Sequence, residues 1–202
     1  MKFKFYALKL SAIMIFLFLL QFVFSDFTSL FLLNQDSFSE LWRFVTAIFL
    51  HGGFPHLLYN LFALALFGSI LEKYIGSKKF LFVFFVTGIF ANLISINYYD
   101  ASLGASGAIF GIIGALVLIR PMLVVWAFGL PMPMFLAGAL WAVGDVIGIF
   151  VPSNVANVAH LSGMFFGLVF GLIYRERVST KNEKRLIIDE SSMRKWEEVN
   201  LE

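Results

Sequence analysis

The chain has 202 residues, of which 60% are hydrophobic, 18% aromatic and only 14% charged. Because an average soluble domain carries about 25% charged residues, this composition excludes an ordinary soluble domain and indicates that most of the surface faces lipid. The net charge of +2 combines mixed signs, and the absence of a basic patch with interleaved aromatic residues argues against a nucleic-acid partner. The chain has no cysteine, which excludes disulfides, a thiolate metal site and a cysteine nucleophile.

The hydrophobic segments predict an all-α membrane protein with six membrane-spanning helices, since a spanning helix needs about 20 apolar residues. The first segment follows Lys2 and Lys4 and has no small-x-small cleavage site after it, so we interpret it as a retained span rather than a signal peptide. The predicted spans are 5–24, 56–71, 80–97, 104–119, 131–150 and 155–174, with an apolar connector at 122–130 that we expect at the membrane interface. We therefore expect a membrane domain over 1–174 and a charged cytoplasmic tail over 175–202, flexible or forming a short helix.

The distribution of basic residues predicts the orientation, because cytoplasmic loops are enriched in Lys and Arg. On the opposite side Arg43 stands alone among four acidic residues. The basic residues of the first side are Lys2, Lys4, Lys73, Lys78, Lys79, Arg120, Arg175, Arg177 and Lys181. We expect a multi-pass cell-membrane protein with both termini in the cytoplasm.

The fourth predicted span is short. Its 16 residues give about 24 Å of helix, while the hydrocarbon core is about 30 Å thick. It is therefore expected to start below the outer surface, with a non-helical segment at 98–103 dipping inward to meet it. Such backbone is tolerated at that depth only where protein or water surrounds it, so the sequence predicts a recessed polar cavity that opens to the extracytoplasmic side.

Four polar residues from three spans are expected at this depth. His56 and Asn60 are four residues apart and share one helix face in the outer half of the second span. Ser106 begins the fourth span, and His160 lies one to two turns into the sixth. Peptide hydrolysis needs a hydroxyl, a base and donors for the developing oxyanion, and these residues supply all three. Each also has an ordinary interpretation: helix packing for Ser106, a structural or proton-relay histidine for His160, and an interhelical hydrogen bond for Asn60.

Glycine spacing predicts that the fourth and sixth spans approach closely. Gly107, Gly111 and Gly114 lie along the fourth span, and the sixth has glycines at +3, +7 and +11 from His160, on one helical face (Gly163, Gly167 and Gly171). Without side chains two backbones can come close, which would bring the His160 ring within hydrogen-bond reach of Ser106.

These motifs, in this order, resemble the rhomboid family of intramembrane serine proteases. The match consists of Trp42-Arg43, His51, His56-x-x-x-Asn60, Glu72, Gly76, Gly104-Ala105-Ser106-Gly107 and Ala159-His160-Leu161-Ser162-Gly163. The resemblance implies a serine endopeptidase with a six-span bundle, acting on single-span membrane proteins without a cofactor or metal. It leaves the oligomeric state open.

The resemblance also implies roles for individual residues. Ser106 would be the nucleophile and His160 the general base of a dyad without an aspartate. The oxyanion hole would comprise His56, Asn60 and the Ser106 backbone N–H, with supporting positions at Gly104, Gly107, Phe110 and His51. Two positions depart from the family pattern: Phe110 stands where Tyr is frequent and is expected to stack on His160, and Ser162 stands where many members have Gly or Ala.

Four alternatives compete with this interpretation. An aspartyl intramembrane protease would use Tyr99-Asp100 and Gly144-Asp145, but Asp100 is predicted in a loop, and Asp145 is expected to cap or hydrogen-bond near the outer end of its helix. A zinc site from His51, His56 and His160 lacks an acidic ligand and a His-Glu-x-x-His pattern. An inactive relative that binds membrane clients would typically lack the serine or the histidine. A channel or transporter would carry intramembrane charges or a repeated half, and neither was recognised in the sequence.

Overall fold

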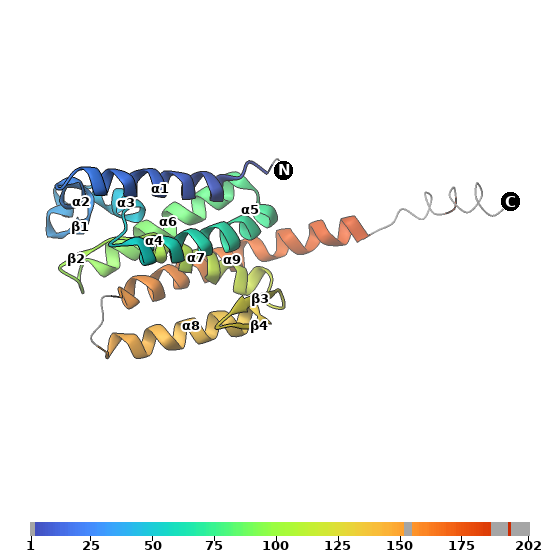
Figure 1. The fold of residues 1–202 in the computed structure, drawn as a ribbon. Helices are drawn as coiled ribbons and strands as arrows, with labels where there is room; N and C mark the ends of the chain where they lie inside the picture. The colour runs from blue at the N-terminus through green and yellow to red at the C-terminus, as the bar shows by residue number, and fades with distance from the viewer. Residues whose placement is uncertain (1–2, 152–154, 187–193, 195–202) are drawn as a thin grey trace.

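The computed structural model describes residues 3–151, 155–186 and 194, without the side chains of 176–186, and it shows a bundle of helices (Figure 1). The α-helices in chain order are α1 (Tyr6–Val23), α2 (Phe27–Phe31), α3 (Arg43–Thr46), α4 (Phe54–Ala63), α5 (Ser69–Ile75), α6 (Ser77–Ser95), α7 (Ser106–Ile119), α8 (Met134–Ile149) and α9 (Asn157–Leu186). A π-helical stretch, Leu64–Gly68, joins α4 and α5 into one continuous helix.

Within the described residues, four helices are long and apolar enough to cross a membrane: α1, α4 with α5, α6, and α9 up to Arg175. Two shorter apolar helices, α7 and α8, complete the bundle. The prediction of an all-α membrane bundle is confirmed. The short fourth helix is confirmed as well, since α7 has 14 residues and is preceded by non-helical backbone. Six membrane crossings remain a prediction.

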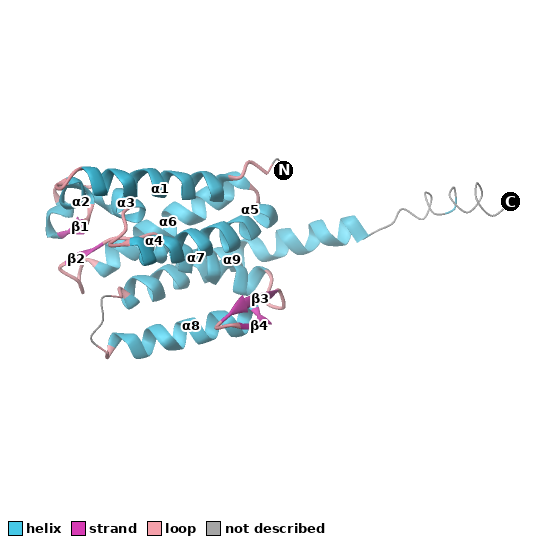
Figure 2. Cartoon of the chain, viewed as in Figure 1, coloured by secondary structure: helices cyan, strands magenta, loops and turns pink. Residues whose placement is uncertain are grey.

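Several helix boundaries differ from the predicted ones by a few residues, and two segments differ in their structure or extent. The connector after α7 is a β-hairpin in which β3 (Val124–Ala127) pairs antiparallel with β4 (Leu130–Pro133), so α8 begins at Met134 rather than at 131. Its two-residue turn, Phe128-Gly129, has positive φ at both positions (55° and 78°), which matches the twist of the flanking strands. Helix α9 continues past residue 174 to Leu186, and the division into a membrane domain and a tail remains a prediction. Figure 2 shows the two small strand pairs at opposite ends of the bundle.

Helices α7 and α9 are in direct backbone contact at the centre of the bundle. A Cβ added at Gly163 would overlap the carbonyl oxygen of Gly107, and one added at Gly167 would overlap that of Gly111. Gly114 in turn faces the carbonyl oxygen of Met164. The close approach predicted from glycine spacing is therefore present over at least two helical turns.

The first loop is held together around Arg43, whose side chain is buried. Its guanidinium donates to the carbonyl oxygens of Ser29 and Leu32, at 2.7 and 3.0 Å, and forms an ion pair with Glu40. These bonds fix the loop in one shape, so that it can serve as a rigid support for the segment that follows α6.

That support is made through the backbone. Strand β1 (Leu33–Asn34) of the first loop pairs antiparallel with β2 (Ala101–Ser102), and the Gly104 N–H donates to the carbonyl oxygen of Ala47 at 2.8 Å. The extended segment between α6 and α7 is thus anchored immediately before Ser106.

The buried carboxylate of Glu72 joins three helices at the opposite end of the bundle. It accepts hydrogen bonds from the backbone N–H groups of Lys4 (3.3 Å) and Ala7 (3.1 Å) and from the Ser77 hydroxyl (2.6 Å). The first two donors lie at the start of α1, where the helix dipole also favours a negative charge. Glu72 on α5 therefore ties the start of α1 to α6.

We expect Glu72→Ala to lower the free energy of unfolding by about 2–4 kcal/mol, because it leaves buried donors without their charged acceptor. Unfolding of the purified protein in mixed detergent micelles measures this difference. The control is Lys73→Ala, which changes the neighbouring exposed residue and should have little effect. Equal stability of the two variants would contradict the assignment of Glu72 as a structural anchor.

Candidate active site

Ser106 is the first residue of α7, at the end of the anchored segment. Gly104, two residues earlier, has φ of +124°, a conformation that residues with a Cβ rarely adopt. The chain turns into the helix at this glycine. Ser106 is only partly buried, so its hydroxyl stands at a helix start with access from outside the bundle core.

The His56 ring from α4 lies against this turn. A Cβ added at Gly104 would lie 2.8 Å from His56 Nε2 and 3.9 Å from Ser106 Oγ. The Gly52 N–H points at His56 Nδ1 at 3.4 Å, so Nδ1 is the acceptor and Nε2 carries the proton of the neutral ring. His56 therefore presents an N–H donor toward the backbone beside Ser106.

Asn60 is buried one turn further along α4, and its side-chain N–H donates to the His56 carbonyl oxygen at 2.8 Å. In this arrangement one of its two N–H groups is used within its own helix. Asn60 thus shares the predicted face with His56, and a role in oxyanion binding remains a prediction.

His51 is buried behind His56, with ring centroids 5.1 Å apart. Its backbone is clamped by Gln21 of α1, which accepts from the His51 N–H at 3.0 Å and donates to its carbonyl oxygen at 3.1 Å. Burial, together with the neighbouring His56, lowers the pKa of His51 to about 4. His51 is therefore neutral at physiological pH and supports the His56 ring by packing.

His160 lies one turn into α9 and is stacked on Phe110 of α7, with centroids 4.3 Å apart and an angle of 9° between the rings. The predicted stacking is confirmed. The start of α9 is held by the Tyr99 hydroxyl, which accepts from the Val158 N–H at 3.1 Å. Gly107, adjacent to Ser106, faces the carbonyl oxygen of Ala159, adjacent to His160. Each candidate catalytic residue is thus adjacent in sequence to a residue of this α7–α9 contact.

One contact of His160 was not anticipated. The Asp145 carboxylate of α8 lies 3.0 Å from His160 Nδ1, and both side chains are about nine-tenths buried (8% and 12% exposed). Asp145 hydrogen-bonds as expected near the end of its helix, but its partner is the candidate base. A single acidic residue in an apolar span was the available signal, since such residues usually have a functional partner.

The structure argues against an aspartyl protease, because Asp100 and Asp145 are not brought together. Asp100 lies on the exposed loop between α6 and β2, whereas Asp145 is buried against His160.

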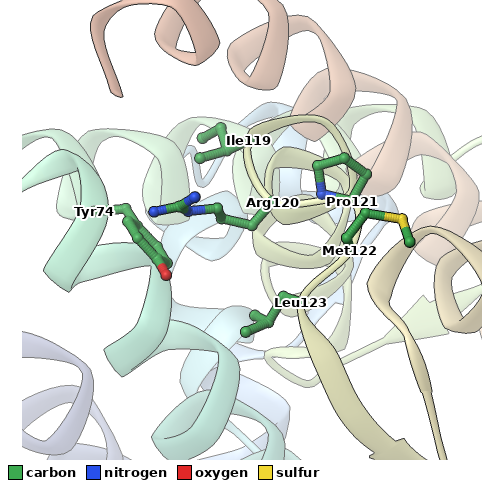
Figure 3. Close-up of a pocket in the computed structure, with 6 residues that line it drawn as sticks. All are labelled: Tyr74, Ile119, Arg120, Pro121, Met122 and Leu123. Carbon is green, nitrogen blue, oxygen red and sulfur yellow. The ribbon is translucent and has the colours of Figure 1, made fainter. Parts of the chain in front are cut away.

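The pocket drawn in Figure 3 is separate from this site. It has a volume of about 430 Å³ and is lined by Tyr74, Ile119, Arg120, Pro121, Met122 and Leu123. Ser106 and Arg120 lie at opposite ends of α7, about 21 Å apart along 14 helical residues. The Arg120 guanidinium covers the Tyr74 ring, with its central carbon 4.4 Å from the ring centroid.

Comparison with known proteins identifies the family. The Rhomboid domain description matches residues 38–177, more than half of the chain. The chain belongs to the rhomboid family. This rhomboid protein is membrane-embedded, and the resemblance noted in its sequence motifs is confirmed.

Three relatives illustrate the range of similarity. The chain is 36% identical over 152 residues to "Putative rhomboid protease YdcA" of Bacillus subtilis, covering 72% of this chain and 71% of the relative. It is 31% identical over 144 residues to "Rhomboid protease GlpG" of Haemophilus influenzae, covering 69% and 72%. It is 30% identical over 137 residues to "RHOMBOID-like protein 6, mitochondrial" of Arabidopsis thaliana, covering 67% of this chain and 44% of that protein.

The geometry at Gly104 predicts a sharp mutational effect. Gly104→Ala would place a Cβ against the His56 ring and strain the backbone, so we expect at least about a tenfold loss of any serine-dependent activity while the helices remain folded. Turnover by the purified variant, alongside its circular dichroism spectrum, measures this. Gly144→Ala on α8 is the control, because a Cβ there meets nothing within 4 Å. If Gly104→Ala kept the turnover of the wild type, the close approach of the His56 ring to Gly104 would not be needed for activity.

Proposed function

We propose that this rhomboid protein is an intramembrane serine endopeptidase, with Ser106 as nucleophile and His160 as general base. The observation that supports it most is the α7–α9 contact, where Gly107 and Ala159 meet between the two residues. In this mechanism His160 takes the hydroxyl proton as Ser106 Oγ attacks the scissile carbonyl carbon. It then returns the proton to the leaving amine, and water hydrolyses the acyl-enzyme.

The tetrahedral intermediate carries a negative oxygen, and donors aimed at this oxygen are the largest single source of rate enhancement in such reactions. We propose that the His56 Nε2–H, an Asn60 side-chain N–H and the Ser106 backbone N–H bind it. The proton on His56 Nε2, inferred from the Gly52 contact at Nδ1, supports this role. The Ser106 N–H is suitable because the first N–H groups of a helix have no partner within the helix.

The substrates that this site suits are single-span membrane proteins. We propose six crossings, with both termini in the cytoplasm and the site opening to the extracytoplasmic side. The N-terminus and the end of α9 leave the bundle at the same end, opposite β1 and β2 (Figure 1). Because the chain has no cysteine, single cysteines introduced at exposed Ser39 and Lys78 test this proposal. An impermeant thiol reagent should label them from opposite sides, and labelling from the same side would refute it.

The proposed chemistry predicts the effect of removing each catalytic group. Ser106→Ala and His160→Ala should each lower turnover of transmembrane-peptide substrates by at least about 10³-fold, and the double variant should be little worse because the pair acts as a unit. Asn60→Ala should cost about 10- to 1000-fold, the effect of losing one oxyanion donor.

The assay uses purified protein with a panel of single-span peptides, read by mass spectrometry. The control is Ser162→Ala, which removes a nearby hydroxyl that donates to the Val158 carbonyl oxygen within α9 and should retain activity. Substantial cleavage by Ser106→Ala would exclude Ser106 as nucleophile. Binding of the peptides by the wild type without cleavage of any would instead indicate a client-binding relative without protease activity.

A further inference from the structure

Asp145 is a buried acid on a helix that is otherwise largely exposed. Many apolar side chains of α8 lie on the surface of the bundle, among them Leu140, Val143, Val146 and Ile147, whereas Asp145 is buried. A carboxylate is costly to bury unless it is paired. Its Oδ1 lies 3.0 Å from His160 Nδ1, and its Oδ2 is buried without a hydrogen-bond partner among the described residues. The pairing with His160 is therefore the compensating contact for this charge.

A second contact fixes the two helices at the same level. A Cβ added at Gly148 would lie 2.6 Å from the Asn157 side-chain oxygen, so α8 and α9 are closely packed here. Asp145 and Gly148 are three residues apart on α8, as are Asn157 and His160 on α9. Residues at this spacing lie on one face of a helix. The antiparallel helices α8 and α9 therefore contact each other at two places, Asp145–His160 and Gly148–Asn157. The packing of the helices, and not the reach of one side chain, places the carboxylate at His160.

We propose that Asp145 is a positioning residue for His160: its carboxylate accepts the Nδ1–H and leaves Nε2 unprotonated, ready to take the Ser106 proton. This inference rests on the proposed function. The resemblance to the family implied a dyad without an aspartate, so Asp145 adds a third member to the catalytic arrangement. The carboxylate also stabilises the imidazolium that forms when His160 takes the proton, as in serine proteases with an aspartate at this place.

Among the described residues, Asp145 is the acidic side chain in contact with His160. Among the residues that the structure describes, the side chain that α7 stacks on His160 is the uncharged Phe110, and the titratable neighbour contributed by α4 is His56. If the contact only linked α8 to α9, an apolar residue would serve at least as well, because replacing a buried ion pair by hydrophobic groups often leaves the stability of the fold unchanged or raises it. A protonated Asp145 would donate to Nδ1 instead, and His160 would then carry its proton on Nε2 and could not act as base.

The two arrangements are separated by ¹⁵N NMR of histidine-labelled protein in detergent micelles, at a pH where the imidazoles are neutral. The chain has three histidines, so His51→Gln and His56→Gln assign the spectrum. We expect His160 in the wild type to carry its proton on Nδ1, and Asp145→Asn to shift it toward the Nε2-protonated tautomer. The wild-type spectrum alone reports the tautomer, so the test does not depend on how well the variant folds.

Kinetics of the same variant test whether the contact matters for turnover. Asp145→Asn keeps the size of the side chain, and we expect kcat to fall about 10- to 1000-fold with KM changed less than about threefold. Gly144→Ala, one residue away with nothing within 4 Å of its added Cβ, should retain both constants. An Nε2-protonated His160 in the wild type, or an unchanged kcat in Asp145→Asn, would overturn the proposal. If the wild type cleaves no substrate, the proposed function fails, while the spectrum still reports the hydrogen bond.

Discussion

The backbone contact between α7 and α9 is the constraint on which the rest of this structure depends. Lipid tails are as apolar as leucine, so helices in a membrane associate through close packing and hydrogen bonds rather than through exclusion from water. Glycines at 107, 111, 163 and 167 let the two helices touch along their backbones. Any side chain at Gly163 or Gly167 would push α9 away and carry His160 with it. The placement of the proposed catalytic pair and the packing of the bundle centre therefore both depend on the same glycines.

The other half of the site depends on polar backbone bonds outside the helices. Arg43 fixes the first loop, and that loop pairs with β2 and anchors Gly104 just before Ser106. His56 is placed against the same turn and is backed by buried His51. Irregular backbone of this kind is tolerated in an apolar environment only when its N–H and C=O groups are paired within the protein. The loop is therefore part of the machinery that positions the proposed nucleophile.

Much of this arrangement could be predicted from the sequence because it follows helical periodicity. The shared face of His56 and Asn60, the glycine contact and the Phe110–His160 stack all depend on spacing within one helix or on two helices touching along one face. The Asp145–His160 contact depends on how α8 packs against α9, and the spacing of residues within one helix does not predict that packing. The β3–β4 hairpin was missed because apolar residues on both sides of Phe128-Gly129 look like an interfacial connector. The Glu72 anchor required three helices to meet, because donors at the start of α1 (Lys4 and Ala7) and on α6 (Ser77) converge on one carboxylate of α5.

In the proposed mechanism, the close approach of α7 and α9 lets His160 activate Ser106. The most direct test of this mechanism is the rate at which a fluorophosphonate modifies the purified protein, with the modified residue located by peptide mass spectrometry. We predict modification at Ser106 in the wild type and at least about a hundredfold slower modification in Gly163→Val, a variant that moves α9 and His160 away from Ser106 without replacing either residue. Gly144→Val, on the exposed part of α8, should react like the wild type. Modification at another residue would show that Ser106 is not the nucleophile, and an equal rate in Gly163→Val would show that Ser106 is not activated by the α7–α9 contact.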